Sequence, residues 1–173
     1  MAIARSGRRI SEPRLRTLLE SLLDASVLCA IATVAGTRAH ANTAYFAWSD
    51  DFRLVWISDP GATHSQNLRR NSSAAVAVFD SRQVWGKPDR GLQLFGTARE
   101  LRGRAAERAQ EVYARRFRGY DGAALRDYRL YELRPRRVKL FDERALGGGT
   151  FVSARIRSGG SLAWERTEVY RAS

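Results

Sequence analysis

Residues 58–71 read SDPGATHSQNLRRN, a segment in which a strand gives way to a short helix. The preceding run 54–57 is apolar and is typical of a buried strand. Residues 59–61, Asp-Pro-Gly, predict a tight turn, because proline fixes φ and glycine tolerates positive φ. Thr63 or Ser65 is then expected to cap the helix. A turn that leads into a helix start leaves backbone N–H groups unpaired, and this geometry suits a phosphate.

The composition predicts one folded domain of an ordinary globular type. The chain has 173 residues, of which 44% are hydrophobic and 28% charged. The formal net charge is +12, but cations and acids are interleaved along the chain, and only Lys87 and Lys139 are lysine. A nucleic-acid surface requires cations gathered on one face, so this pattern disfavours nucleic acid as a partner.

The single cysteine and the start of the chain bear on location. Cys29 has no second cysteine to pair with, which indicates a reducing compartment. The leucine-rich segment after the basic start is interrupted by Arg16, Glu20 and Asp24. We therefore expect neither a signal peptide nor a membrane span, and a cytoplasmic protein.

The chain divides into three expected parts. Residues 1–10 are basic and lack periodicity, so we expect a loose tail. Residues 11–146 are expected to form the folded barrel, and residues 147–173 a C-terminal extension whose hairpin packs on it. Leucines at helical spacing predict a helix that Ser11 caps, and a second amphipathic pattern predicts a helix over 103–117.

Short alternating or apolar runs predict most of the remaining elements as strands. Tight turns between the first three imply an antiparallel meander. Gly96 predicts a bulge or a close backbone approach, and Pro135 is expected to end a strand. The expected class is mainly β with α (α+β), a small antiparallel barrel with flanking helices. The predicted strands are 27–34, 39–48, 53–58, 74–80, 91–101, 128–133, 137–142, 151–157 and 162–170.

The side chains offer little for catalysis by themselves. Two histidines and one cysteine make a zinc site a poor fit, and we predict no metal ligands. Neither a Gly-x-Ser-x-Gly elbow nor a common nucleotide fingerprint occurs. Either histidine could ligate a haem, but nothing selects one. No catalytic acid or base can be named, so a bound cofactor is the expected source of any reactivity.

The order of these elements resembles the pyridoxamine 5′-phosphate oxidase-like family over roughly residues 18–142. The motifs that carry the resemblance are WISDP at 56–60, THSQNL at 63–68 and QLFGTA at 93–98. The resemblance implies an FMN-binding split β-barrel, a homodimer with the flavin at its interface, and a redox reaction on a small organic substrate. Two alternatives stay open: the same fold with the deazaflavin F420, or a non-enzymatic protein that binds haem, flavin or nucleic acid.

The resemblance also implies which residues contact the cofactor. Trp85 and Lys87 would close over the flavin ring from the other subunit, and Gln93 is a further candidate. The residues at the flavin phosphate would be Asn42, Thr43, Ser58, Thr63, His64 and Ser65, with Asn67 bracing the turn.

The sequence departs from the oxidases proper at three places. Their phosphate-binding Arg-Lys pair is replaced by Thr63-His64, and Asn42 stands where an arginine is expected. Their C-terminal substrate-binding arginine–histidine signature is also missing, since residues 164–166 read WER. These departures disfavour a vitamin B6 substrate and make the identity of the cofactor depend on the turn at residues 58–65.

Overall fold

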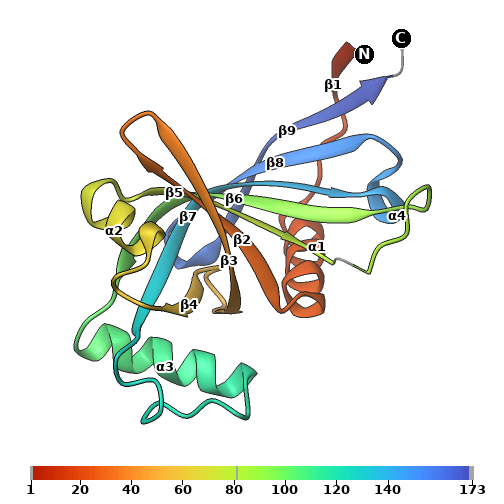
Figure 1. The fold of residues 1–173 in the computed structure, drawn as a ribbon. Helices are drawn as coiled ribbons and strands as arrows, with labels where there is room; N and C mark the ends of the chain where they lie inside the picture. Colours follow the sequence, from red (N-terminus) through yellow and green to blue (C-terminus); the bar gives the residue numbers. More distant parts are fainter. Residues whose placement is uncertain (1, 81, 172–173) are drawn as a thin grey trace.

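The computed structural model describes residues 2–80 and 82–171, which form one antiparallel sheet with helices on its surfaces (Figure 1). The helices are α1 (Glu12–Ala25), α2 (Thr63–Arg70), α3 (Arg104–Arg116) and α4 (Glu143–Leu146), and a 3-10 turn spans Ser158–Gly160. The strands are β1 (Ala2–Ser6), β2 (Leu28–Ala35), β3 (Arg38–Trp48), β4 (Leu54–Ser58), β5 (Ser73–Phe79), β6 (Arg90–Glu100), β7 (Arg129–Asp142), β8 (Thr150–Ile156) and β9 (Leu162–Arg171).

Pairing between β6 and β7 closes part of the sheet into a barrel. The strand order β1-β9-β8-β7-β4-β3-β2-β5-β6 returns from β6 to β7, so the strands from β7 to β6 form a ring. The first residues of β7 pair with β4 and the last with β8, so β8, β9 and β1 continue away from the ring. This is the antiparallel split barrel with flanking helices that the sequence predicts.

One long strand replaces the two that Pro135 was expected to separate. β7 runs without a break from Arg129 to Asp142, because the β6–β7 register shifts between Phe95 and Gly96. Pro135 lies opposite Gly96 at this bulge, where a missing N–H is tolerated. A Cβ at position 96 would overlap the carbonyl group of Arg134, so the predicted close approach at Gly96 is confirmed.

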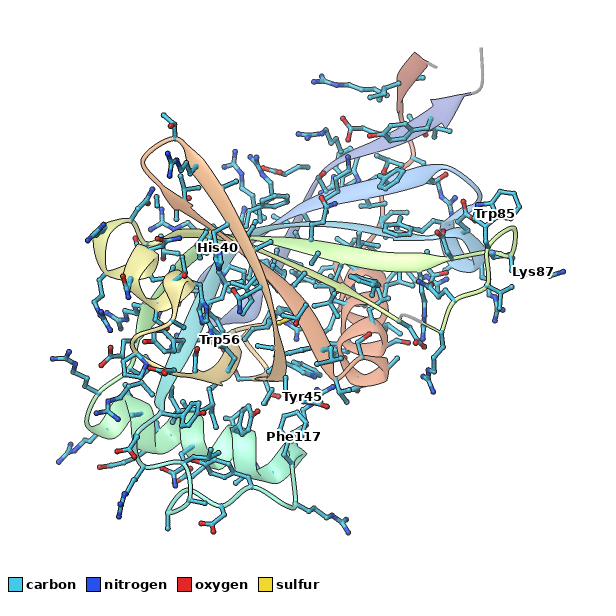
Figure 2. All side chains as sticks on the ribbon, viewed as in Figure 1. His40, Tyr45, Trp56, Trp85, Lys87 and Phe117 are labelled. Carbon is cyan, nitrogen blue, oxygen red and sulfur yellow. The ribbon has the colours of Figure 1, made fainter. Side chains whose placement is uncertain are left out.

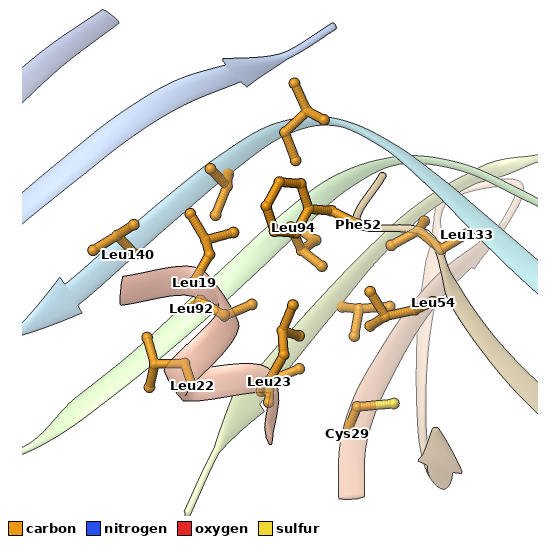
Figure 3. Close-up of a cluster of buried hydrophobic side chains, with 14 of the residues drawn as sticks. Leu19, Leu22, Leu23, Cys29, Phe52, Leu54, Leu92, Leu94, Leu133 and Leu140 are labelled. Atoms are coloured by element: carbon orange, nitrogen blue, oxygen red, sulfur yellow. The ribbon is translucent and has the colours of Figure 1, made fainter. Parts of the chain in front are cut away.

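The core lies between the barrel strands and α1. The leucines of α1 at positions 15, 19, 22 and 23 are at most 1% exposed, which confirms the stripe that the sequence predicts. Figure 3 shows three of them facing Leu92 and Leu94 of β6. Burial of such side chains contributes about 1.5–3 kcal/mol each. The helix α1 covers one opening of the barrel, and α2 with the turn before it lies at the opposite end (Figure 1).

The two ends of the described chain lie together. The segment expected as a loose tail instead contains β1, which pairs antiparallel with β9. Strands β8 and β9 form the expected C-terminal hairpin, and β8 pairs with β7, so the hairpin extends the barrel sheet. Among the described residues, no helix is both long and apolar enough to cross a membrane.

Candidate functional site

The turn between β4 and α2 is held by hydrogen bonds from its own residues. The side-chain carboxylate of Asp59 accepts a hydrogen bond from the N–H of Gly61 at 2.6 Å. The main-chain carbonyl oxygen of Asp59 accepts one from Ser65 Oγ at 2.8 Å. Asn67 Nδ2 donates to Thr33 Oγ1 on β2 at 3.1 Å. Asn67 therefore ties α2 to β2, and the Ser65 hydroxyl donates its proton within the turn.

The helix α2 begins without a side-chain cap, so the prediction that Thr63 or Ser65 would cap it is wrong. The N-cap is Ala62, whose carbonyl oxygen accepts from the N–H of Gln66 at 3.0 Å. The N–H groups of residues 63–65 precede this first bond and have no acceptor within the helix. Thr63 is exposed, and Ser58 is half-buried beside the same turn. These N–H groups are the donors that an anion can use.

His64 is buried at this helix start and is only 6% exposed. Burial, and secondarily the neighbouring His40, lower the pKa of His64 below its ordinary value of 6.5. The ring is therefore neutral at neutral pH, so it offers a hydrogen bond rather than a charge. The nearest arginine on the helix, Arg69, donates to the carbonyl oxygen of Pro60.

Two buried aromatic residues extend this site into the barrel. The ring of Tyr131 on β7 lies edge-on to His64, with centroids 6.3 Å apart, and stacks on Trp56 of β4 at 5.8 Å. Among the described residues, Trp56 Nε1, His64 Nε2 and Tyr131 OH are buried without a hydrogen-bond partner. Sequence reasoning took Trp56 as a core or dimer-contact residue and missed Tyr131, because the contact between the two rings depends on cross-strand register.

Asn42 lies on the inner face of β3, next to the same end of the barrel. Its register partner on β2 is the buried Ile31, and His40 two residues earlier pairs with the buried Thr33. Asn42 Oδ1 is a further buried atom without a partner among the described residues. The structure thus brings Asn42 and His40 to the barrel end that α2 covers.

Thr43 and Gln93 lie on the opposite, outer face of the sheet. A row of register partners runs from Thr43 through Ala30 and Ala77 to Gln93. The two alanines between them have short side chains, so the surface is lower there than at the polar side chains of Thr43 and Gln93 on either side. Thr43 therefore faces away from Asn42 and His40, and the two parts of the predicted site lie on different sides of β3.

Trp85 and Lys87 lie far from His40 within one chain (Figure 2). They lie on the loop between β5 and β6, and Figure 2 shows them at the opposite end of the molecule from His40. Trp85 is 99% exposed and contacts nothing that would hold its ring. Within one chain, therefore, the predicted site residues form three separate groups.

Comparison with known proteins gives the family and the fold. The sequence profile of pyridoxamine 5′-phosphate oxidase matches residues 15–142. No curated protein sequence matches the chain.

Solved structures of low sequence identity share the fold. A pyridoxamine 5′-phosphate oxidase-related, FMN-binding protein from Nostoc punctiforme is 14% identical over 87% of this chain and 91% of its own, with a TM-score of 0.61. A haem-binding protein from Mycobacterium smegmatis is 18% identical over 86% of this chain and 59% of its own, with a TM-score of 0.62. A conserved hypothetical protein from Mycobacterium tuberculosis is 19% identical over 83% and 91%, with a TM-score of 0.65.

Proposed function

Because this chain belongs to the pyridoxamine 5′-phosphate oxidase family, we propose that it is a homodimeric flavoprotein that binds FMN and acts on a small organic molecule. The observation that carries the proposal is the group of unpartnered polar atoms beside the start of α2. Bound FMN supplies hydride or electron transfer, and the protein supplies binding and orientation.

The turn between β4 and α2 (residues 58–65), which we call the α2 turn, fits the phosphate of FMN through neutral hydrogen-bond donors. The N–H groups of residues 63–65 have no acceptor within the helix, and Thr63 adds an exposed hydroxyl. Among the described residues, the buried Nε2 of His64 has no hydrogen-bond partner, and we propose that the phosphate supplies one. A helix start attracts anions through its dipole as well as its N–H groups. A neutral histidine in place of a cation predicts weaker phosphate binding than a lysine at this position would give.

The outer face of the sheet fits the ring and a second subunit. Exposed apolar side chains on this face include Leu28, Tyr45 and Phe79, which are 46%, 56% and 51% exposed. Covering them with the same face of a second chain would remove this apolar area from water. The row from Thr43 to Gln93 lies on this face. In such a dimer the partner's loop would carry Trp85 and Lys87 toward the ring, as the family resemblance implies.

The deciding experiment compares FMN with riboflavin, which lacks the phosphate. The proposal predicts quenching of flavin fluorescence on titration with the protein, with FMN bound more tightly than riboflavin. His64→Ala should reduce this preference by about tenfold, the size of a lost hydrogen bond to a charged group. Arg70→Ala removes a charge from the far end of the same helix and should have a smaller effect. Protein that binds neither flavin would contradict the proposal.

The dimer is tested separately through Ala77, at the centre of the outer face. Ala77→Arg should convert a dimer into a monomer in light scattering coupled to size exclusion. Thr37→Arg, in the exposed turn between β2 and β3, serves as the control and should leave the mass unchanged. A wild-type monomer at micromolar concentration would contradict the shared flavin site.

Haem binding is a second candidate, favoured by the two histidines at one end of the barrel. Within residues 2–80 and 82–171, His64 Nε2 is buried without a hydrogen-bond partner, and His40 is half-buried on β3. The haem-binding protein from Mycobacterium smegmatis has the same fold. A Soret band on adding haemin, lost in His64→Ala or His40→Ala, would favour haem over flavin. Titration with the deazaflavin F420 in the same assay as FMN tests the third cofactor.

A further inference from the structure

An arginine-lined groove crosses the sheet at the bulge between β6 and β7. It consists of two adjoining hollows of about 640 and 500 Å³. The larger is bounded by the turn before β4, the middle of β7 and the segment from the end of β8 to Gly159, and the smaller continues along β6 to Phe95. Thr97, Arg136 and Arg155 line both hollows, so the two are continuous. We call this feature the arginine groove.

The bulge explains why an arginine projects into both hollows. Phe95 pairs with Arg137 and Gly96 with Pro135, so Arg136 is the extra residue on β7 and has no partner on β6. A bulged residue leaves the regular alternation of the strand. Arg136 is exposed and belongs to the lining of both hollows.

The positive charge of the arginine groove is only partly neutralised. Arg53 pairs with Asp51 at 2.6 Å, and Arg134 pairs with Glu132 at 2.6 Å. Across the described residues, neither Arg136 nor Arg157 has an ion-pair partner. Around the two hollows, six arginines share three carboxylates: Arg53, Arg134, Arg136, Arg137, Arg155 and Arg157 against Asp51, Glu132 and Glu165.

One of these carboxylates already serves two cations. Glu165 accepts a hydrogen bond from Arg155 at 2.6 Å and forms an ion pair with Arg137 at 3.0 Å. Burial raises the pKa of Glu165, but the two guanidinium groups outweigh it and leave the pKa below its ordinary value. The carboxylate is therefore ionised at neutral pH, and its single negative charge is shared by Arg137 and Arg155. The positive charges of Arg136 and Arg157 are therefore left to attract an added anion.

The shape and chemistry of the arginine groove indicate the class of anion. Guanidinium groups bind phosphate oxygens through two parallel hydrogen bonds, and a concave site with uncompensated cations concentrates anions. The volume of each hollow lies in the range of small-molecule sites, about 300–1,000 Å³. Phe95, 39% exposed, adds an aromatic face at one end.

We propose that the arginine groove binds a small molecule carrying two or more phosphate groups. The phosphates would bridge Arg136 and the neighbouring unpaired Arg157, and an aromatic part of the ligand would lie toward Phe95. The site is distinct from the α2 turn, and its Phe95 end lies on the outer face of β6, two residues from Gln93.

The test uses the full chain and tripolyphosphate as the probe, measured by isothermal titration calorimetry at low salt. Arg136→Glu with Arg157→Glu should weaken binding by roughly tenfold or more, because each removes a charge-assisted hydrogen bond without breaking an ion pair. Arg115→Glu with Arg118→Glu makes the same change of net charge on exposed residues of α3 and its end, and should weaken binding by less than about threefold. Both double variants should retain the FMN affinity of the wild type, whatever that affinity is.

Several outcomes would overturn the proposal. Equal weakening by the two double variants would reduce the effect to net charge. Sulfate binding as tightly as tripolyphosphate would exclude a site for several phosphates, and binding of long nucleic acid alone would assign the arginines to another partner. Titration with ATP tests whether Phe95 contacts an aromatic part of the ligand. If ATP binds more tightly than tripolyphosphate and Phe95→Ala removes the difference, the ligand carries an aromatic group. If the two affinities are equal, the site recognises the phosphate chain alone.

Discussion

Gly96 faces the main-chain carbonyl group of Arg134 across the β6–β7 bulge, with no room for a side chain between them. Gly96→Ala would force the two strands apart and should lower the free energy of unfolding by about 1–3 kcal/mol. Urea unfolding followed by circular dichroism measures this change. Gly119→Ala is the control, because a Cβ there would have no atom within 4 Å. Equal losses in the two variants would show that the close approach is not what selects glycine.

Arg116 ties α3 to the end of α1, and its loss should destabilise the chain. Its guanidinium donates to the carbonyl oxygens of Leu23, at 2.7 Å, and Ser26, and lies over the ring of Phe46. Arg116→Ala should lower the free energy of unfolding by about 1.5–3 kcal/mol, because those buried carbonyls lose a charged donor. Arg115→Ala, at the exposed neighbouring position, should change it by less than about 0.5 kcal/mol. Similar urea midpoints for the two variants would contradict this role.

His64 should make the protein without ligand less stable in mild acid. The folded state lowers the pKa of His64, so below about pH 6.5 the unfolded chain binds this proton and the folded chain resists it. The free energy of unfolding should therefore fall as the pH drops from about 7 toward 5.5. His64→Gln removes the titrating group and should flatten this part of the curve. Parallel wild-type and variant curves of urea midpoint against pH would rule out the effect.

The hydroxyl of Tyr131 should be dispensable for stability. It is buried without a hydrogen-bond partner among the described residues, beside Trp56 and His64. Tyr131→Phe keeps the ring stack and removes an unsatisfied polar atom, so the unfolding free energy should stay within about 0.5 kcal/mol or rise. A loss above about 1 kcal/mol would reveal a hydrogen bond through bound water. Tyr131→Leu, which removes the ring, should cost more than Tyr131→Phe.

The thiol of Cys29 should react only when the protein unfolds. It is buried, and burial raises its pKa to about 12, so the reactive thiolate is scarce at neutral pH. Ellman's reagent should label it at a rate that rises with urea in step with global unfolding. Cys29→Ala combined with Thr37→Cys places the thiol in an exposed turn and should react within seconds to minutes. Fast labelling of the native wild type would show local opening of β2.

Local patterns in the sequence predict the barrel strands well, because each alternating run has one apolar face that must be buried. These local patterns fail where the structure of a segment is decided by its pairing with a distant strand. Pro135 ends a strand in an isolated pattern, but the bulge at Gly96 removes the need for its N–H. Residues 2–6 lack an apolar pattern, and their pairing with β9 depends on a strand more than 150 residues away.

The candidate site also combines features that the local sequence predicts with features that depend on distant strands. The segment at residues 58–71 is local, so the sequence predicts a strand end, a tight turn and a short helix there. The contact of Tyr131 with His64 depends on β7 returning beside β4, which no local pattern contains. The arginine groove also escapes sequence reasoning, since its arginines come from β7, from β8 and from the loops before β4 and after β8, and similar charges occur elsewhere in the chain.

The position of β7 has a consequence for how the chain folds as it is synthesised. The strands β4 and β6 are complete long before β7 leaves the ribosome, yet both need it as a neighbour. Until then each presents an unpaired edge, and the apolar interior has no closing wall. Barrel formation is therefore a late, non-local event, which favours slow folding and makes the nascent chain prone to aggregation.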